Sequence, residues 1–178
     1  MLTMDGVNEN GVAININVVP SDLQHTIGTN PGAKRLCAGV VPRYILDNAK
    51  SAEHAISLLM ERDIFTIFLS EFHFMISDSN ESYIVEMSQN KLVVLKQAGT
   101  NKTAMSNFHV SNSPLQQDYT VVVGEPGTCR LEYTDHPLGI ERYNLAITDL
   151  DKVTGLDSGA YSMVDHMKRI YYKHVNVD

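Results

Sequence analysis

The spacing of apolar residues changes along the chain, and these changes predict the order of its elements. Residues 11–19, GVAININVV, are typical of a β-strand, because Val and Ile are enriched in strands. Residues 40–49 and 51–63 carry apolar side chains at helical spacing, with Ser51 in a position suited to an N-cap. They predict two abutting helices, or one kinked helix, between about residues 41 and 62.

The centre of the chain is expected to form a meander of antiparallel strands. Short β-rich runs cover residues 72–78, 81–88 and 91–97, with turn-like residues between them. The second run alternates apolar and polar residues, which indicates a sheet with at least one half-exposed face. Residues 103–111 predict a further strand that ends in polar residues, and a strand over 119–123 is expected within a long loop.

The last third of the chain returns to helical spacing, over residues 140–153 and 157–172. The order is therefore strand, helices, strand meander, helices. This order indicates an α+β protein with an antiparallel sheet rather than alternating βαβ units. Neither a repeat nor a convincing domain boundary interrupts it, so residues 1–178 are expected to form a single domain.

Composition and charge exclude several classes of function. The chain has 178 residues, 43% of them apolar, and a net charge of −7. Nucleic-acid binding is not expected, because it requires clustered basic residues and the longest basic cluster here is Lys168-Arg169. No apolar run approaches the length of a membrane span, and the first residues do not resemble a signal peptide. We therefore expect no membrane partner and a cytoplasmic location.

Cysteine and histidine spacing bears on the chemistry. The two cysteines form no CxxC pair, which argues against a disulfide framework and a zinc ribbon. The seven histidines show no metal-binding spacing, so neither a metal nor another cofactor is expected. Cys37 lies in an apolar stretch and is interpreted as a small buried residue. A Cys–His nucleophile built on Cys37 or Cys129 stays open as one hypothesis.

Five motifs in order resemble a known family. They are DGVNENGVAININVV (5–19), PRYILDNAKSAEHAISLL (42–59), HFMISDSNESYIVEM (73–87), AMSNFHVS (104–111) and GIERYNLA (139–146). Their order and spacing are similar to those of the choloylglycine hydrolase family, whose members are linear amide C–N hydrolases such as conjugated bile acid hydrolases and penicillin V acylases. One motif alone would be weak, but the five together extend through most of the chain.

The resemblance implies an N-terminal nucleophile hydrolase, with an α/β/β/α sandwich of two antiparallel sheets. In that family the first residue of the mature chain is a cysteine, whose thiol attacks the amide carbonyl while its own α-amine accepts the proton. Asparagine side chains and backbone N–H groups then stabilise the oxyanion. An arginine helps to set the electrostatics of the nucleophile.

The resemblance assigns three candidate site residues. Asn17 matches an asparagine on the family's strand, Asn107 matches its second asparagine, and Arg142 matches its arginine. Asn15 shares a strand face with Asn17, because side chains alternate along a strand, so both are expected to line the same cleft. This role explains why a β-strand carries two asparagines, a residue type that strands otherwise avoid.

The chain also departs from the family pattern. The nucleophilic cysteine is expected dozens of residues before the turn at Asp5, where this chain has only Met1-Leu2-Thr3 and Met4. A final W-[ST]-x-V-Y strand pair is likewise absent after residue 172. We therefore expect a fold that is incomplete at both ends and inactive alone. Open sheet edges would favour pairing with another copy, so a homo-oligomer is expected.

Three functional hypotheses remain at this stage. The first is a hydrolase of linear amides acting on a small molecule, such as a bile acid conjugate or penicillin V. The second is a catalytically inactive binding module derived from that fold. The third is an unrelated α+β enzyme that uses Cys37 or Cys129. Residues 21–39 contain no aromatic side chain, which argues mildly against a pocket for a phenoxyacetyl group.

Overall fold

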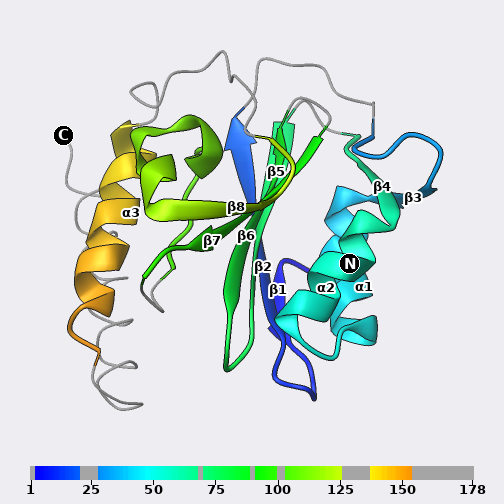
Figure 1. Ribbon diagram of the computed structural model, residues 1–178, viewed down its shortest axis with the longest axis horizontal. Coiled ribbons are helices and arrows are strands. Elements are labelled where there is room, and N and C mark those ends of the chain that lie inside the picture. The colour runs from blue at the N-terminus through cyan, green and yellow to red at the C-terminus, as the bar shows by residue number, and fades with distance from the viewer. Residues whose placement is uncertain are drawn as a thin grey trace.

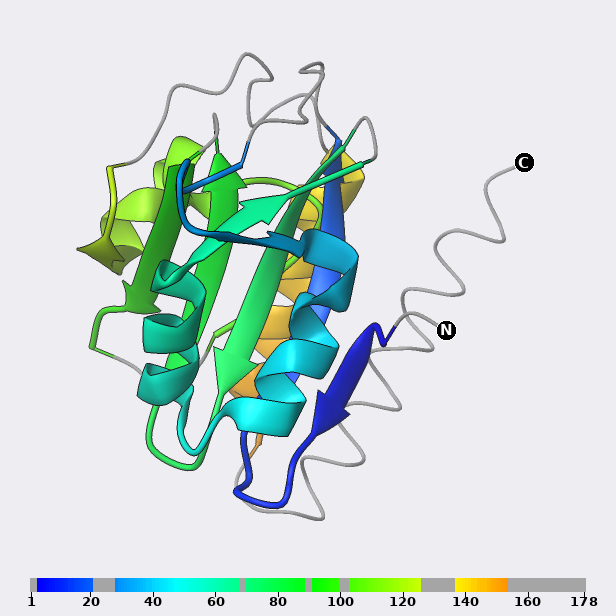
Figure 2. The same cartoon turned by 90° about the vertical axis from the view of Figure 1, so that its right-hand side faces the viewer.

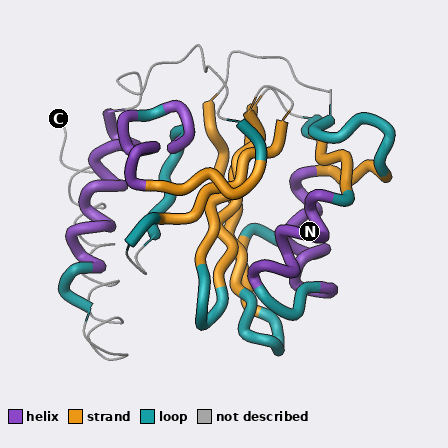
Figure 3. The backbone as a smooth tube through the Cα atoms, in the orientation of Figure 1, coloured by secondary structure: helices purple, strands orange, loops and turns teal. Residues whose placement is uncertain are grey.

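The computed structural model describes residues 3–20, 28–67, 70–88, 91–99, 103–125 and 137–153. The strands are β1 (Asp5–Val7), β2 (Ala13–Pro20), β3 (Lys34–Cys37), β4 (Arg62–Phe65), β5 (Ser70–Ser77), β6 (Ser82–Ser88), β7 (Lys91–Gln97) and β8 (Tyr119–Val123). The α-helices are α1 (Val41–Asn48), α2 (Ala52–Met60) and α3 (Pro137–Leu150). Short 3₁₀ turns cover Ala38–Val40 (η1), Val110–Asn112 (η2) and Pro114–Asp118 (η3). Figure 3 shows how these helices and strands follow one another along the backbone.

Six of these strands form one antiparallel sheet, in the order β1-β2-β5-β6-β7-β8. The helices α1 and α2 lie on one side of this sheet, together with the parallel pair β3–β4, while α3 lies on the other side (Figure 1). The perpendicular view looks onto the sheet with α1 and α2 in front of it and α3 behind it (Figure 2). The predicted mixture of helices with an antiparallel sheet is therefore confirmed, and the described residues form one large antiparallel layer of the expected sandwich.

Each face of the sheet packs its own apolar core, as strand alternation requires. On one face, Ile14, Ile16 and Phe74 are buried in a cluster that also contains α1 and α2 residues. On the opposite face, Ile84, Val93, Leu95, Phe108 and Tyr143 form a second cluster, which α3 and residues 104–110 complete. The side chains of β2 that point away from the first core therefore face the side of the sheet on which α3 lies.

The two predicted helices are separate, and the start of α2 is stabilised locally. The Ser51 side chain accepts a hydrogen bond from the backbone N–H of His54 at 3.0 Å, which confirms the predicted N-cap. The Asp78 carboxylate accepts another from Ala52 N–H at 2.8 Å. Because Asp78 belongs to the turn between β5 and β6, this contact joins α2 to the main sheet.

The predicted strand over residues 103–111 is wrong. This segment bends at Asn107 and continues into η2 and η3 instead of entering the sheet. The position beside β7 is occupied by β8, as the predicted strand over 119–123 required. The backbone N–H groups of Val110 and Ser111 bond to the side chain of Glu86, so their acceptor is not a neighbouring strand.

Smaller differences concern the ends of the predicted elements. The second helix ends at Met60, and the last residues assigned to it form β4, which pairs in parallel with β3. β3 covers residues to which the sequence pattern assigned no strand. The predicted helix over 157–172 lies outside the described residues. Among the helices of the described segments, none has both the length and the apolar content needed to cross a membrane.

Candidate functional site

Two of the three candidate site residues are in direct contact. The Asn107 side-chain amide donates a hydrogen bond from Nδ2 to the Val18 carbonyl at 2.7 Å. The Asn107 Oδ1 atom accepts one from Arg142 Nη2 at 2.9 Å. Asn107 therefore connects β2, α3 and the 103–109 segment, although 89 residues separate it from Val18 along the chain.

The geometry of the sheet edge explains why Asn107 binds at Val18. The backbone N–H of Ile16 donates to the Met4 carbonyl at 2.9 Å, so the polar groups of Ile16 face β1. Backbone groups of alternate residues point to the same edge of a strand, and the Val18 carbonyl therefore points beyond the end of β1. Asn107 satisfies this edge carbonyl in place of a further strand.

Asn17 occupies the position on β2 directly before Val18. It is half buried and lies opposite His73 in the pairing of β2 with β5. Ile14 and Ile16 are buried in the core formed with α1 and α2, so Asn15 and Asn17 face the other side, on which α3 lies. The fold thus brings Asn107 into contact with Arg142 and places Asn17 next to their anchor on β2.

Arg142 retains a polar group that these contacts do not use. Its Nε atom is buried and has no hydrogen-bond partner among the described residues. A buried N–H group without an acceptor is uncommon in folded proteins, because it loses its hydrogen bond to water. This donor is therefore suited to an acceptor supplied from outside the described segments.

A buried polar cluster lies on the same side of the sheet. Glu86 and His73 are fully buried, and Glu71 and His109 are almost so. His73 lies opposite both Asn17 on β2 and Glu86 on β6, which makes a continuous row across three strands. The sequence analysis missed this cluster, although charged residues within the apolar runs of β5 and β6 were a signal for it.

Glu86 bonds to the segment that carries Asn107. Its Oε1 atom accepts from Val110 N–H at 2.6 Å, and its Oε2 atom accepts from Ser111 N–H at 3.1 Å. His73 Nδ1 lies 3.9 Å from Glu86 Oε1. Burial by itself raises the pKa of the Glu86 carboxyl, but the contacts with His73, His109 and Ser111 outweigh burial and hold the pKa below its usual 4.5.

A second acid–imidazole contact holds the same segment. His109 Nε2 lies 3.3 Å from Glu71 Oε2, and both side chains are buried. Asn112 follows on this segment, with its Nδ2 atom 3.5 Å from His109 Nδ1. Residues 107–112 are therefore attached to β2, β5 and β6 by polar contacts, in addition to the apolar packing of Phe108 and Val110.

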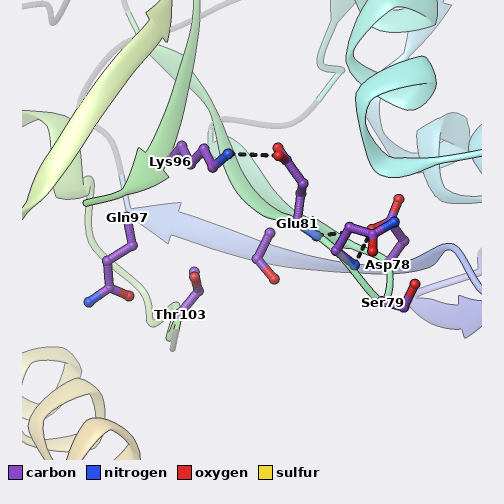
Figure 4. Close-up of a pocket in the computed structure, with 8 residues that line it drawn as sticks. Asp78, Ser79, Glu81, Lys96, Gln97 and Thr103 are labelled. Atoms are coloured by element: carbon purple, nitrogen blue, oxygen red, sulfur yellow. Dashed lines mark hydrogen bonds and ion pairs between the residues drawn. The ribbon is translucent and has the colours of Figure 1, made fainter. Parts of the chain in front are cut away.

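A metal site and a pocket are two other features to compare with this arrangement among the described residues. Within the described ranges, no group of three or more His, Cys, Asp or Glu side chains is placed to hold a metal ion. An open polar pocket of about 430 Å³ lies at the β5–β6 turn (Figure 4). There Lys96 pairs with Glu81 at 2.8 Å, and Thr103 and Gln97 complete the wall. None of Asn17, Asn107 and Arg142 lines this pocket.

Cys37 is remote from the candidate site. It is half buried rather than fully buried, and it ends β3, which lies with α1 and α2 on the opposite side of the main sheet from α3 (Figure 1). This position weakens the hypothesis of a Cys37 nucleophile acting with the candidate residues. Cys129 lies outside the described residues.

Comparison with known proteins points to one family. The model of the family described as linear amide C–N hydrolases, choloylglycine hydrolase family, matches residues 1–135. A search of the curated proteins finds no match.

Solved structures have the same fold. One is a penicillin V acylase from Agrobacterium tumefaciens, with 16% identity and a TM-score of 0.53 over 95% of this chain and 52% of that one. Another is a mutant of a conjugated bile acid hydrolase from Clostridium perfringens, with 19% identity and a TM-score of 0.56 over 93% of this chain and 59% of that one. The chain thus spans little more than half the length of either protein.

Proposed function

This chain belongs to the choloylglycine hydrolase family of linear amide C–N hydrolases, and from that membership we propose that it serves in hydrolysis of a linear amide. Asn17, Asn107 and Arg142 form the part of the site that receives the amide carbonyl. The observation that supports this most directly is the pair of hydrogen bonds from Arg142 to Asn107 and from Asn107 to Val18. These bonds support the proposal because Val18 directly follows Asn17 on β2.

The hydrogen-bond inventory of Asn107 leaves a donor for substrate. An asparagine amide has two N–H donors and one acceptor oxygen. Val18 uses one donor and Arg142 uses the acceptor, which leaves the second N–H. A preorganised donor of this kind, directed at a developing oxyanion, typically stabilises the transition state by about 2.7–4 kcal/mol. The buried Arg142 Nε atom is a further donor at the same contact.

We also propose that this chain alone binds its amide without cleaving it. The family mechanism needs a cysteine thiol whose own α-amine accepts the proton. Among the described residues the cysteine is Cys37, which ends β3 and lies on the opposite side of the sheet from α3. The polar wall of the site is thus supplied without the thiol.

The alternative is a binding module that has lost catalysis altogether. The same contacts favour it, because the donors that would hold a carbonyl do not depend on a nucleophile. The substrate class of both proposals is a small linear amide, and the relatives' names suggest conjugated bile acids and penicillin V as the first compounds to examine.

Calorimetric titration of the purified chain tests the proposal. The probes are a glycine-conjugated bile acid, penicillin V and an acyl-homoserine lactone, and chromatography follows hydrolysis in the same samples. We expect binding of at least one probe, no turnover, and about tenfold weaker binding for Asn107→Ala and Arg142→Ala, since each loses a hydrogen bond. Asn144→Ala is the matched control, because Asn144 is exposed on α3.

The other outcomes are equally informative. Absence of binding to all three probes, or an equal loss in the Asn144→Ala variant, would contradict the assignment of the site. Turnover that thiol alkylation abolishes would contradict the proposal that the chain alone is inactive. It would favour a nucleophile at Cys37 or Cys129.

A further inference from the structure

Glu86 is a fully buried carboxylate in the middle of an apolar surface. On its face of the sheet, Ile84, Val93 and Leu95 are buried around it. A buried carboxylate is costly unless hydrogen bonds and opposite charges compensate its lost hydration. Apolar packing therefore does not explain why this position holds a carboxylate, whereas the polar contacts of Glu86 do.

The contacts of Glu86 replace a missing strand. Residues 103–112 follow β7, but β8 occupies the neighbouring position in the sheet. The N–H groups of Val110 and Ser111 would then be buried without an acceptor, and the Glu86 carboxylate accepts both, one on each oxygen. Within the segment, the Phe108 N–H donates to the Ser106 carbonyl at 3.0 Å.

The same segment holds the candidate site. Asn107 lies three residues before Val110 and reaches both Val18 and Arg142. Because only Phe108 and His109 lie between them, and Phe108 is packed in the core, a displacement of Val110 is expected to shift Asn107. The anchor and the site are thus two ends of one short segment, fixed at β6 by Glu86 and at β2 by Asn107.

From this geometry we propose that Glu86 is a positioning residue, whose carboxylate anchors residues 107–111 and thereby sets Asn107 and Arg142 for the amide carbonyl. The proposal rests on the proposed function only for what Asn107 and Arg142 bind. The anchoring itself is independent of any substrate.

The charge state of Glu86 decides whether the anchor exists. An ionised carboxylate accepts both N–H groups, whereas the protonated form turns one oxygen into an O–H donor. The groups that face Glu86 are His73 on β5, His109 on the segment and Tyr119 on β8. Beyond them, Glu71 contacts His109, and the Tyr143 hydroxyl on α3 contacts the Tyr119 hydroxyl at 2.8 Å.

The two histidines act on the same carboxylate. Neither ring nitrogen of His73 has a hydrogen-bond partner among the described residues. The Glu86 carboxylate lies close to this ring, with Oε1 at 3.9 Å from Nδ1. Burial raises the pKa of Glu86, but the interactions with His73, His109 and Ser111 have the larger effect. The net result is a lowered pKa. The anchor consequently persists through neutral pH and is released only in acid.

Amide hydrogen exchange measured by NMR tests the anchor without any substrate. In Glu86→Gln, one carboxylate oxygen becomes an NH₂ donor that opposes a backbone N–H. We expect the amides of Val110 and Ser111 to exchange about tenfold faster or more. The Asn107 side-chain resonances should shift, while amides of β6 and β7 keep their protection. Glu81→Gln is the control, because Glu81 makes its contacts near the surface.

Unchanged exchange at Val110 and Ser111, or an unmoved Asn107 side chain, would overturn the proposal. If Glu86→Gln does not fold, the wild-type chain is titrated instead. The Val110 amide proton should then move with the Glu86 carboxyl below pH 4.5, and Asn107 should move with it. Asn107 resonances that ignore this titration would overturn the proposal equally.

Probe binding separates this inference from the proposed function. A folded Glu86→Gln chain with faster exchange should bind the amide probe about tenfold more weakly than wild type. If wild type binds no probe, the proposed function fails, while the exchange result still decides the anchor. If Glu86→Gln binds like wild type in spite of a released segment, the positioning role is rejected and the site assignment stands.

Discussion

At the scale of single residues, Asn107 uses both the nitrogen and the oxygen of its side-chain amide. Its nitrogen donates to Val18 and its oxygen accepts from Arg142. Aspartate has the same shape but no donor, so it would place a carboxylate oxygen against the Val18 carbonyl. The difference in stability between wild type and Asn107→Asp therefore measures the contact of Asn107 with β2.

We predict that Asn107→Asp lowers the free energy of unfolding by about 1–3 kcal/mol, the usual cost of leaving a polar group without its partner. Urea unfolding at pH 7 measures this change. Asn144→Asp is the control, and it should change stability by less than about 0.5 kcal/mol, because Asn144 is exposed on α3. Equal effects in the two variants would contradict the described contact.

Two glycines at positive φ, Gly11 and Gly124, differ in the space available to a Cβ atom. Gly124 has φ = 77° and Gly11 has φ = 79°, both in the left-handed region. A Cβ atom at Gly124 would overlap the Leu92 carbonyl oxygen, whereas at Gly11 no heavy atom lies within 4 Å. The two positions therefore share the conformational cost of alanine but not the steric one.

Gly11→Ala should destabilise the protein by about 1–2 kcal/mol, the cost of a left-handed residue with a Cβ atom. Gly124→Ala should destabilise the protein more than Gly11→Ala does, because the Leu92 backbone cannot move without disturbing β7. Thermal unfolding followed by circular dichroism compares them. Equal losses would show that the overlap at Leu92 is relieved without cost.

At the scale of elements, a hydroxyl pair is one of the contacts that join α3 to the sheet. The Tyr119 hydroxyl on β8 lies 2.8 Å from the Tyr143 hydroxyl on α3, and both side chains are buried. Phe108 packs edge-on against Tyr143, with ring centroids 5.7 Å apart. Burial and the hydrogen bond with Tyr143 both raise the pKa of Tyr119, so its hydroxyl is neutral at physiological pH.

A double-mutant cycle measures this connection. We predict that Tyr119→Phe and Tyr143→Phe each destabilise the protein, and that the double variant loses less than the sum of the two. Each single variant leaves the remaining hydroxyl buried without its partner, whereas the double variant leaves no hydroxyl unpaired. The expected coupling energy is therefore about 0.5–3 kcal/mol. Urea unfolding of the four proteins supplies the numbers, and strict additivity would mean that the hydroxyls do not interact.

For the whole molecule, buried and hydrogen-bonded carboxylates set the stability in acid. Hydrogen bonds from the backbone of Ala52 and Asn80 lower the pKa of Asp78 below its usual 3.8. The pKa of Glu86 is also lowered, from 4.5, for the reasons given above. In each case the unfolded chain binds the proton at a higher pH than the folded chain does. Stability is therefore full above these usual values and is lost as the pH falls below them.

We predict that the free energy of unfolding is nearly constant from pH 7 to about pH 5 and then falls steadily toward about pH 3. Urea unfolding at each pH gives the profile. Asp78→Asn should be less stable than wild type at pH 7 and should show a smaller decrease in acid, since one of the titrating groups is removed. A profile for Asp78→Asn that parallels wild type would contradict this origin of the acid sensitivity.

The edges of the main sheet are the surfaces on which the predicted association between copies depends. Among the described strands, β1 and β8 each pair on one side only. Val7 on β1 is 69% exposed, and Val122 on β8 is 48% exposed. Open edges with apolar side chains favour pairing with another chain. A homo-oligomer stays a prediction that follows from these two strands.

Sedimentation velocity at increasing concentration tests this prediction. We expect association of the wild-type chain and a larger monomer fraction for Val7→Lys or Val122→Lys, since an edge lysine opposes strand pairing. Val153→Lys is the control, because Val153 is exposed at 37% but lies outside the sheet. A wild-type chain that stays monomeric at every concentration would exclude the predicted oligomer.

The amino-acid sequence by itself determined most elements of the fold and their family. Strand and helix periods located β2, β5, β6, β7 and β8 and the three α-helices, because periodicity records which side chains are buried. The resemblance singled out Asn107 and Arg142, although their positions differ by 35 in the sequence and nothing local predicts their contact. β3, β4 and the role of Glu86 were missed.

Only the tertiary structure decided how residues 103–112 satisfy their backbone. Their local pattern is typical of a strand, and nothing nearby in the sequence contradicts it. The acceptor for Val110 is the Glu86 side chain, 24 residues earlier, and β8 occupies the place that a strand there would need. A hydrophobic period specifies which groups are buried, whereas the partner of a buried polar group depends on which distant segment the fold brings beside it.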